Sequence, residues 1–203
     1  MPCAFSQEQI EAVIAFHGHS CPGLTIGVRA AELALRELDH PKDSDMAAVV
    51  ETDMCGVDAI QFLTGCTMGK GNLIHRDYGK MAFSFYDRGT GEGFRALLNP
   101  KARGGMDEEM GELMGKIDAG TADETDKKRV EELREALRQR FLDLDLDEMF
   151  CVTPLETRPP RPARILSSLV CDACGESVME SRTRRFGGKT LCIPCFGQAE
   201  QKI

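Results

Sequence analysis

The stretch CDACGESVMESRTRRFGGKTLCIPC, residues 171–195, decides the fold of the C-terminal end of this chain. Its cysteines form two Cys-x2-Cys pairs separated by 17 residues: Cys171, Cys174, Cys192 and Cys195. Zinc is commonly bound by four thiolates in a tetrahedron, and two intervening residues let one turn present both sulfurs to one ion. Gly187-Gly188 supplies a hairpin turn between the pairs. The pattern predicts a structural zinc site in a treble-clef module.

An iron–sulfur cluster and a redox dithiol are the alternatives for these cysteines, and both are less typical of this spacing. The module is too small to bury a core of its own, so the metal is expected to supply most of its folding energy. Phe186 is the single aromatic residue of the hairpin. A structural or docking role is therefore favoured over nucleic-acid binding.

Upstream of the module, RPPRPAR (158–164) has three prolines in seven residues and predicts an extended linker. We therefore expect a core over 1–157, a linker over 158–168 and the zinc module over 169–203. From Arg158 onward the sequence has eight basic and four acidic residues, although the whole chain has a net charge of −8. A basic tail on an acidic body suits nucleic acid or an acidic partner, or is simply a solvated linker.

The core is expected to be α+β, with helices and strands mixed along the chain. Ser6 and Gln9 form a capping-box pattern at the start of the first helix. The predicted helices are 6–16, 24–38, 55–63, 107–117 and 123–142. The predicted strands are 47–52, 81–86 and 149–153.

The composition fits a soluble globular protein, with 42% hydrophobic and 29% charged residues. No apolar run reaches the length of a membrane span, and the N-terminus lacks the basic start of a signal peptide. We therefore expect a cytoplasmic protein with no membrane partner. In a reducing compartment, nine cysteines are better explained by metal or thiol chemistry than by disulfides.

Three glycine-rich loops concentrate the reactive side chains of the core. The loop HGHSCPG (17–23) holds His17, His19 and Cys21 between two predicted helices. Imidazole and thiolate together suit zinc, iron, copper or nickel. The helix that follows would lower the pKa of Cys21 through its dipole. The sequence therefore predicts a metal or thiol site here.

The second loop, DMCGVD (53–58), places Cys55 and Asp58 where a strand meets a helix, a common position for ligand sites. The third loop, TGCTMGKGN (64–72), could hold an anion with backbone amides and Lys70. Its spacing is not that of a Walker A loop. Its predicted ligand-binding residues are Cys66, Thr67, Lys70 and Asn72.

Other cysteines and histidines have plainer interpretations. Cys3 and Cys151 are expected to act as small buried hydrophobes. His40 and His75 are more typical of surface or capping positions than of ligands.

The stretches FHGHSCPG (16–23), CGVDAIQFLTGCTMGKGN (55–72) and DYGK (77–80) resemble the FmdE family of formylmethanofuran dehydrogenase proteins. The zinc module is similar to the treble clef of some members. The resemblance implies an α+β core, a homodimer and a metal- or ligand-binding cleft. That cleft would be lined by residues from all three loops: His17, His19, Cys21, Cys55, Cys66 and Lys70.

Three functions follow from these observations. The first is a metal-binding accessory protein of a molybdenum or tungsten oxidoreductase, which the resemblance links to methanogenesis. The second is an enzyme that uses Cys21 or Cys55 as nucleophile with His17 or His19 as base. The third is an adaptor for nucleic acid or protein that works through the basic tail.

Overall fold

The computed structural model describes residues 3–39 and 45–199, so His40 lies outside the described residues. The chain divides into two compact units, Met1–Pro162 and Ala163–Ile203. The first contains the mixed helices and strands expected of the core. The second contains the paired cysteines. Each unit is considered by itself.

A five-stranded sheet in the order β2-β1-β3-β4-β5 forms the centre of the first unit. β1 pairs with β2 in parallel, and all other neighbours are antiparallel. The strands are β1 (Met46–Val50), β2 (Leu73–His75), β3 (Ala82–Asp87), β4 (Gly93–Leu98) and β5 (Phe150–Pro154). β2 and β4 were not predicted from the sequence.

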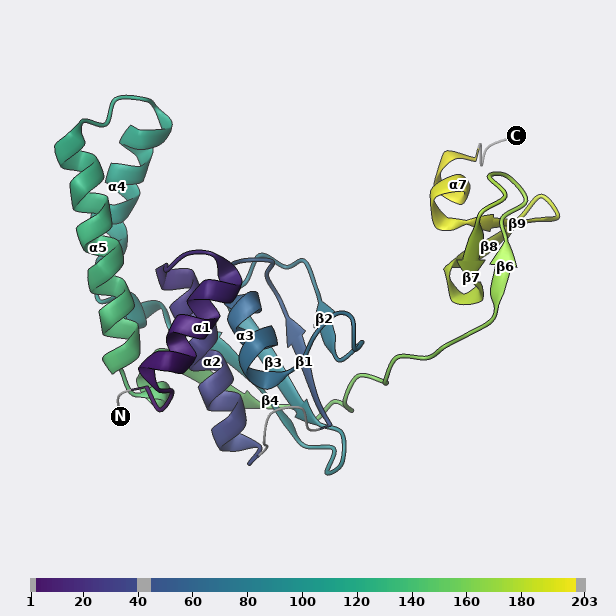
Figure 1. Cartoon of the computed structure of the whole chain (residues 1–203), viewed down its shortest axis with the longest axis horizontal. Helices are drawn as coiled ribbons and strands as arrows, with labels where there is room; N and C mark the ends of the chain where they lie inside the picture. Colours follow the sequence, from purple (N-terminus) through teal and green to yellow (C-terminus); the bar gives the residue numbers. More distant parts are fainter. Residues whose placement is uncertain (1–2, 40–44, 200–203) are drawn as a thin grey trace. The chain divides into compact units, whose positions relative to one another are not determined.

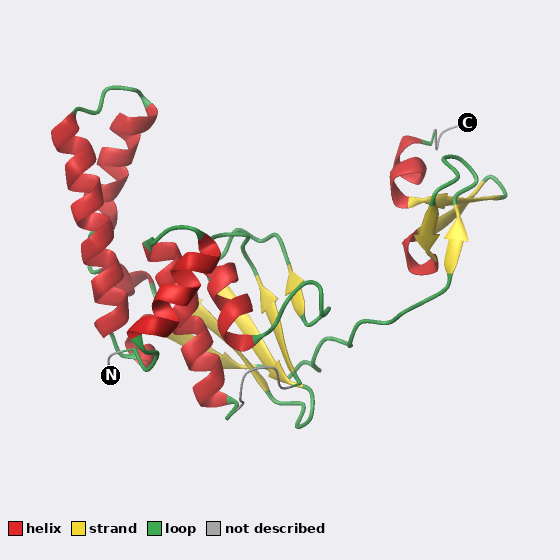
Figure 2. Ribbon diagram, in the orientation of Figure 1, coloured by secondary structure: helices red, strands yellow, loops and turns green. Residues whose placement is uncertain are grey.

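Three helices pack on one face of this sheet, as Figures 1 and 2 show: α1 (Gln7–His17), α2 (Pro22–Glu37) and α3 (Gly56–Thr64). The capping box of Ser6 and Gln9 is confirmed at the start of α1. Phe83 and Phe85 of β3 are fully buried under these helices, together with Ile60 of α3. This packing fixes the starts of α2 and α3 over one end of the sheet.

The helices α4 (Asp107–Asp118) and α5 (Glu124–Asp143) form an antiparallel hairpin that extends away from the sheet (Figure 1). Leu113, Val130 and Leu133 pack between them. Leu137 and Phe141, nearer the end of α5, belong instead to the main hydrophobic core of the unit. α5 therefore runs from an outer hairpin into the body of the unit, beside α2. The short helices η1 (Pro100–Arg103) and α6 (Leu146–Met149) complete the unit.

Cys151 is a correction to the sequence prediction, because its side chain is exposed rather than buried. β5 is an edge strand, and only Phe150 of that strand is buried. His75 is exposed, as its surface assignment predicted.

The second unit contains two small antiparallel hairpins and a short helix. Its elements are β6 (Ser168–Val170), β7 (Ser177–Met179), η2 (Glu180–Arg182), β8 (Thr183–Phe186), β9 (Lys189–Cys192) and α7 (Ile193–Gln198). Gly187 and Gly188 form the predicted turn with φ of 57° and 76°. Among the described residues of both units, no helix combines the length and apolar character needed to span a membrane.

Candidate functional site

The first three candidate residues follow the end of α1. His17 is the last residue of that helix, and Gly18 ends it in a left-handed conformation with φ of 97°. Glycine suits this position because it has no Cβ to clash. Cys21 then caps α2, and its Sγ accepts a hydrogen bond from the backbone N–H of Leu24 at 3.3 Å. The sharp turn thus returns His19 and Cys21 toward His17.

Cys55 reaches the same place from a distant part of the sequence, because α2 and α3 approach very closely. A Cβ placed on Gly27 would lie 2.0 Å from the carbonyl oxygen of Gly56. A Cβ placed on Gly23 would lie 3.9 Å from the Sγ atoms of both Cys21 and Cys55. Two glycine-lined helices therefore bring the two thiols together.

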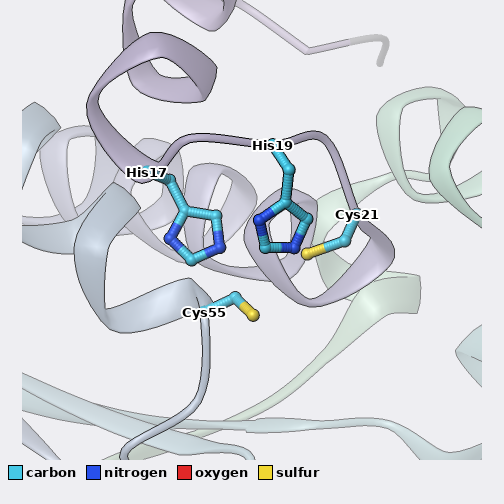
Figure 3. Close-up of side chains that lie close together, drawn as sticks. All are labelled: His17, His19, Cys21 and Cys55. Carbon is cyan, nitrogen blue, oxygen red and sulfur yellow. The ribbon is translucent and has the colours of Figure 1, made fainter.

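His17, His19, Cys21 and Cys55 form one cluster, in which each residue offers a nitrogen or sulfur atom within 4.8 Å of the others. Figure 3 shows both imidazoles and both sulfurs directed into a common space. The two rings lie 4.4 Å apart between centroids. Among the described residues of the core, these four side chains are the group with metal-ligand spacing.

His17 is oriented for metal binding by Asp58. The Nδ1–H of His17 donates to Oδ2 of Asp58 at 2.7 Å, and the other oxygen of Asp58 accepts from Gln61 at 3.4 Å. This bond leaves the lone pair on Nε2, which is the arrangement found in carboxylate–histidine–metal sites. Nε2 is buried and has no hydrogen-bond partner among the described residues. A buried nitrogen with this geometry would be satisfied by a metal ion in the cluster.

The electrostatics of Cys55 favour a ligand over a free nucleophile. Burial, then the adjacent Cys21, raises the pKa of the Cys55 thiol above its usual range. A raised pKa reduces the thiolate population at neutral pH, which disfavours nucleophilic catalysis. A divalent cation reverses this tendency, because it binds and stabilises the thiolate.

The loop after α3 does not contribute to this cluster. Cys66 is fully buried in the core, and its Sγ faces the carbonyl of Met46 at 3.5 Å. Met46 begins β1, whereas Cys55 follows the other end of that strand. The nine residues of α3 separate the two cysteines further, at about 1.5 Å per residue. The structure therefore places Cys66 away from the cleft in which the sequence placed it.

The amides of the same loop close the loop itself rather than surround an anion. The backbone N–H of Thr67 donates to Oδ1 of Asn72 at 2.9 Å, and that of Lys70 donates to Oγ1 of Thr67 at 3.2 Å. Asn72 also donates to Met46 at 3.0 Å. Thr67, Lys70 and Asn72 thus lie in a structural turn apart from the cluster.

A second cluster lies in the C-terminal unit, where the four predicted thiols come within 4.8 Å of one another: Cys171, Cys174, Cys192 and Cys195. Backbone N–H groups of Cys174 and Cys192 lower the pKa of Cys171 to about 6. Hydrogen bonding with the neighbouring thiols of Cys192 and Cys174 raises the pKa of Cys195 to about 12. Four sulfurs this close resist full ionisation unless a cation offsets their repulsion, as zinc does.

Sequence reasoning did not find several residues that shape the core site. The sequence indicated no role for Gly27. It predicted that Asp58 binds a ligand, whereas in the structure Asp58 orients His17. Met54, 52% exposed, lies beside Cys55. One further wall of the site comes from α5 through four charged residues: Glu131, Arg134, Glu135 and Arg138. Alternating charges on a helix are typical of a solvated surface, so the sequence carried no signal for them.

Comparison with protein-family models gives two matches. Residues 16–151 match the family described as "FmdE, Molybdenum formylmethanofuran dehydrogenase operon". Residues 164–201 match the prokaryotic dksA/traR C4-type zinc finger. The second match confirms a zinc-finger unit around the four C-terminal cysteines.

Two similar proteins span nearly all of this chain. A protein of Archaeoglobus fulgidus named "Probable S-adenosyl-L-methionine-binding protein" is 33% identical over 190 residues. That match covers 90% of this chain but only 50% of the relative, so the chain spans about half the length of this curated relative. The crystal structure of a tungsten formylmethanofuran dehydrogenase FmdE-like protein from Syntrophus aciditrophicus is 27% identical, with a TM-score of 0.63. It covers 98% of this chain and 96% of the neighbour.

Proposed function

Because the chain belongs to the FmdE family and carries a C-terminal C4-type zinc finger, we propose that it is a metal-binding protein whose core site holds one transition-metal ion through His17, His19, Cys21 and Cys55. Two imidazoles and two thiols form a donor set that suits zinc or iron and excludes the hard cations magnesium and calcium. When bound, the metal supplies Lewis acidity to a ligand in the adjacent cleft.

The buried Nε2 of His17 is the observation that carries this proposal. A buried nitrogen without a hydrogen-bond partner costs free energy. The hydrogen bond to Asp58 already orients the His17 ring so that the Nε2 lone pair faces both thiols, and the ring need not move to bind a metal. A purely structural role for His17 would leave that cost without compensation. A metal ion in the cluster compensates it and also removes the repulsion between Cys21 and Cys55.

Elemental analysis of the whole chain, purified without oxygen, tests the core site. We expect one zinc in the tail and one further metal ion per chain in the core. Cys21→Ser should remove the core metal alone, and Cys174→Ser should remove the tail zinc alone. A wild-type chain that holds a single metal ion, lost in Cys174→Ser and kept in Cys21→Ser, would refute the core site.

We further propose that the protein serves as an accessory to a molybdenum or tungsten oxidoreductase. The family description names a molybdenum enzyme, and the Syntrophus neighbour is described by a tungsten enzyme. Affinity purification of a tagged chain should then recover a larger complex, and elemental analysis of that complex should detect molybdenum or tungsten. Retention of no such complex from cells grown with either metal would argue against this role.

The zinc unit is proposed as an element that docks a protein partner, and nucleic-acid binding is the alternative to test. Its β8–β9 region exposes four cationic side chains: Arg182, Arg184, Arg185 and Lys189. Binding through these groups should weaken steeply as salt rises, because phosphate contacts release counterions. Absent or salt-independent binding would leave a protein-docking role.

The core is proposed to form a homodimer, which light scattering would show as twice 22.4 kDa.

A second candidate function is binding of S-adenosyl-L-methionine, which the name of the Archaeoglobus relative suggests. The cleft next to the metal cluster, at about 460 Å³, lies within the range of small-molecule sites. Calorimetric titration of the whole chain with this compound tests the idea. An absence of heat at millimolar ligand would place that binding in the half of the relative that this chain does not match.

A further inference from the structure

A cavity of about 460 Å³ opens directly onto the core cluster. One wall is formed by the cluster and its flanking loops, including His19, Cys21, Met54 and Cys55. The opposite wall is one face of α5, which presents Glu131, Arg134, Glu135 and Arg138. A molecule in this cavity would therefore have both soft metal ligands and charged groups within its lining.

The two arginines of the α5 wall are less exposed than the glutamates that pair with them. The side chain of Arg134 is 45% exposed, whereas its partner Glu131 is 70% exposed. Arg138 is 27% exposed, whereas its partner Glu135 is 62% exposed. The arginine side chains are thus less exposed than the glutamate side chains that pair with them. Both signs of charge line the cavity, so the wall as a whole is neutral and offers a ligand two guanidinium donors beside two carboxylates.

These arginines already donate hydrogen bonds to carboxylates. Glu135 binds Arg138 through both oxygens, to Nε at 2.8 Å and to one terminal nitrogen. Glu131 binds Arg134 at 2.6 Å. Ion pairs between exposed side chains on one helix contribute little to stability. An incoming carboxylate can therefore displace a glutamate at little cost.

From this arrangement we infer that the cavity binds a small carboxylate, held at one end by Arg134 and Arg138 and reaching the core metal with a coordinating group at its other end. The inference rests on the metal site proposed above. A carboxylate fits better than a phosphate, because the displaced glutamates stay near the wall and repel a second negative charge. The soft and apolar end, with Met54 and Pro22, suits a short carbon chain that carries the coordinating atom.

Mercaptoacetate and 2-mercaptoethanol are a matched pair of probes for this cavity. Both present a thiol to the metal on a two-carbon chain, but only mercaptoacetate carries a carboxylate. Calorimetric titration of the metal-loaded whole chain, without oxygen, should show mercaptoacetate binding a few-fold more tightly, about fivefold at most, as expected for an ion pair with a partly exposed arginine. Arg134→Gln/Arg138→Gln should bind both probes equally and keep its core metal.

Two further variants control for folding and for general charge. Arg129→Gln removes a guanidinium from the same helix at a position that pairs with Glu109 and Glu132 outside the cavity. It should keep the preference for mercaptoacetate. Arg134→Gln alone, at a half-exposed position, should lose part of the preference even if the double variant does not fold.

Metal content measured on the same samples distinguishes a failure of the metal site from a failure of the carboxylate site. A core that holds its metal but shows no preference for mercaptoacetate overturns the carboxylate site and leaves the metal site standing. A preference lost equally in Arg129→Gln also overturns the carboxylate site. A core without metal refutes the metal site and, with it, a carboxylate bound to that metal.

Discussion

Replacing Gly27 with alanine should disrupt the core metal site from a position that contacts no ligand. The new Cβ would lie 2.0 Å from the carbonyl oxygen of Gly56 and 2.4 Å from its Cα. Both atoms belong to the backbone of α3, so no flexible side chain can move aside. Restoring an ordinary contact requires α2 and α3 to separate by about 1.4 Å along this direction.

Two measurable effects follow from that displacement. Overpacking of a close contact costs about 1–3 kcal/mol, which lowers the melting temperature of a domain of this size by roughly 2–12 °C. Cys55 directly precedes Gly56 and moves with it, whereas metal–ligand distances tolerate about 0.2 Å. Gly27→Ala should therefore lose the core metal while it keeps the zinc of the tail.

The matched control is Gly115→Ala in α4, where a Cβ meets no atom of the described residues within 4 Å. Alanine in an exposed helix should stabilise the protein by about 0.5–1 kcal/mol and leave the metal content unchanged. Thermal unfolding and elemental analysis of both variants test the pair. A Gly27→Ala protein with unchanged melting temperature and full metal content would refute the close-packing argument.

Three further predictions concern side chains around the core. Asp58→Asn should weaken core metal binding about 10- to 100-fold in a chelator competition, whereas Asp77→Asn, at an exposed site, should not. Cys66→Ala should leave the core metal content unchanged and cost less than about 3 kcal/mol in urea unfolding, since Cys66 lies in the core. The hydrogen bond from Arg95 lowers the pKa of Glu51 below 4.5, so the stabilisation is present above pH 4.5 and is lost as pH falls through the lowered pKa. Glu51→Gln should remove that part of the acid dependence, as measured by urea unfolding from neutral pH down into the acid range.

The sequence predicted most elements with strong local signals and missed those that depend on pairing. The capping box at Ser6 and the long periodic stretch of α5 are local features, and both helices are present. β2 has only three residues, and it is a strand because Leu73 and its neighbours pair with β1. Such a short segment has no periodicity of its own to recognise.

The candidate site likewise combines residues whose proximity the sequence could predict with one whose position depends on packing. His17, His19 and Cys21 lie within five residues, so their proximity could be predicted from sequence alone. The addition of Cys55 depends on the contact between Gly27 and Gly56, which is a property of packed helices. Cys66 had an equally suggestive context, yet the length of α3 carries it toward the other end of β1, beside Met46. Distance along a helix, rather than residue type, decided which thiol joined the cluster.

The origin of the ligands also determines how each metal site relates to folding. The four cysteines of the tail lie within one small unit, and the buried hydrophobic cluster of its described residues is Cys171, Leu191 and Cys192. Such a unit has little apolar burial to hold it without metal, so its folding and zinc binding should be one event. The core ligands are instead held by a large apolar core and by Asp58, before any metal binds. A strong chelator should therefore expose the tail to protease while the core keeps its helical circular dichroism and its melting transition. Loss of core helix on chelation would mean that the core site, too, is assembled by its metal.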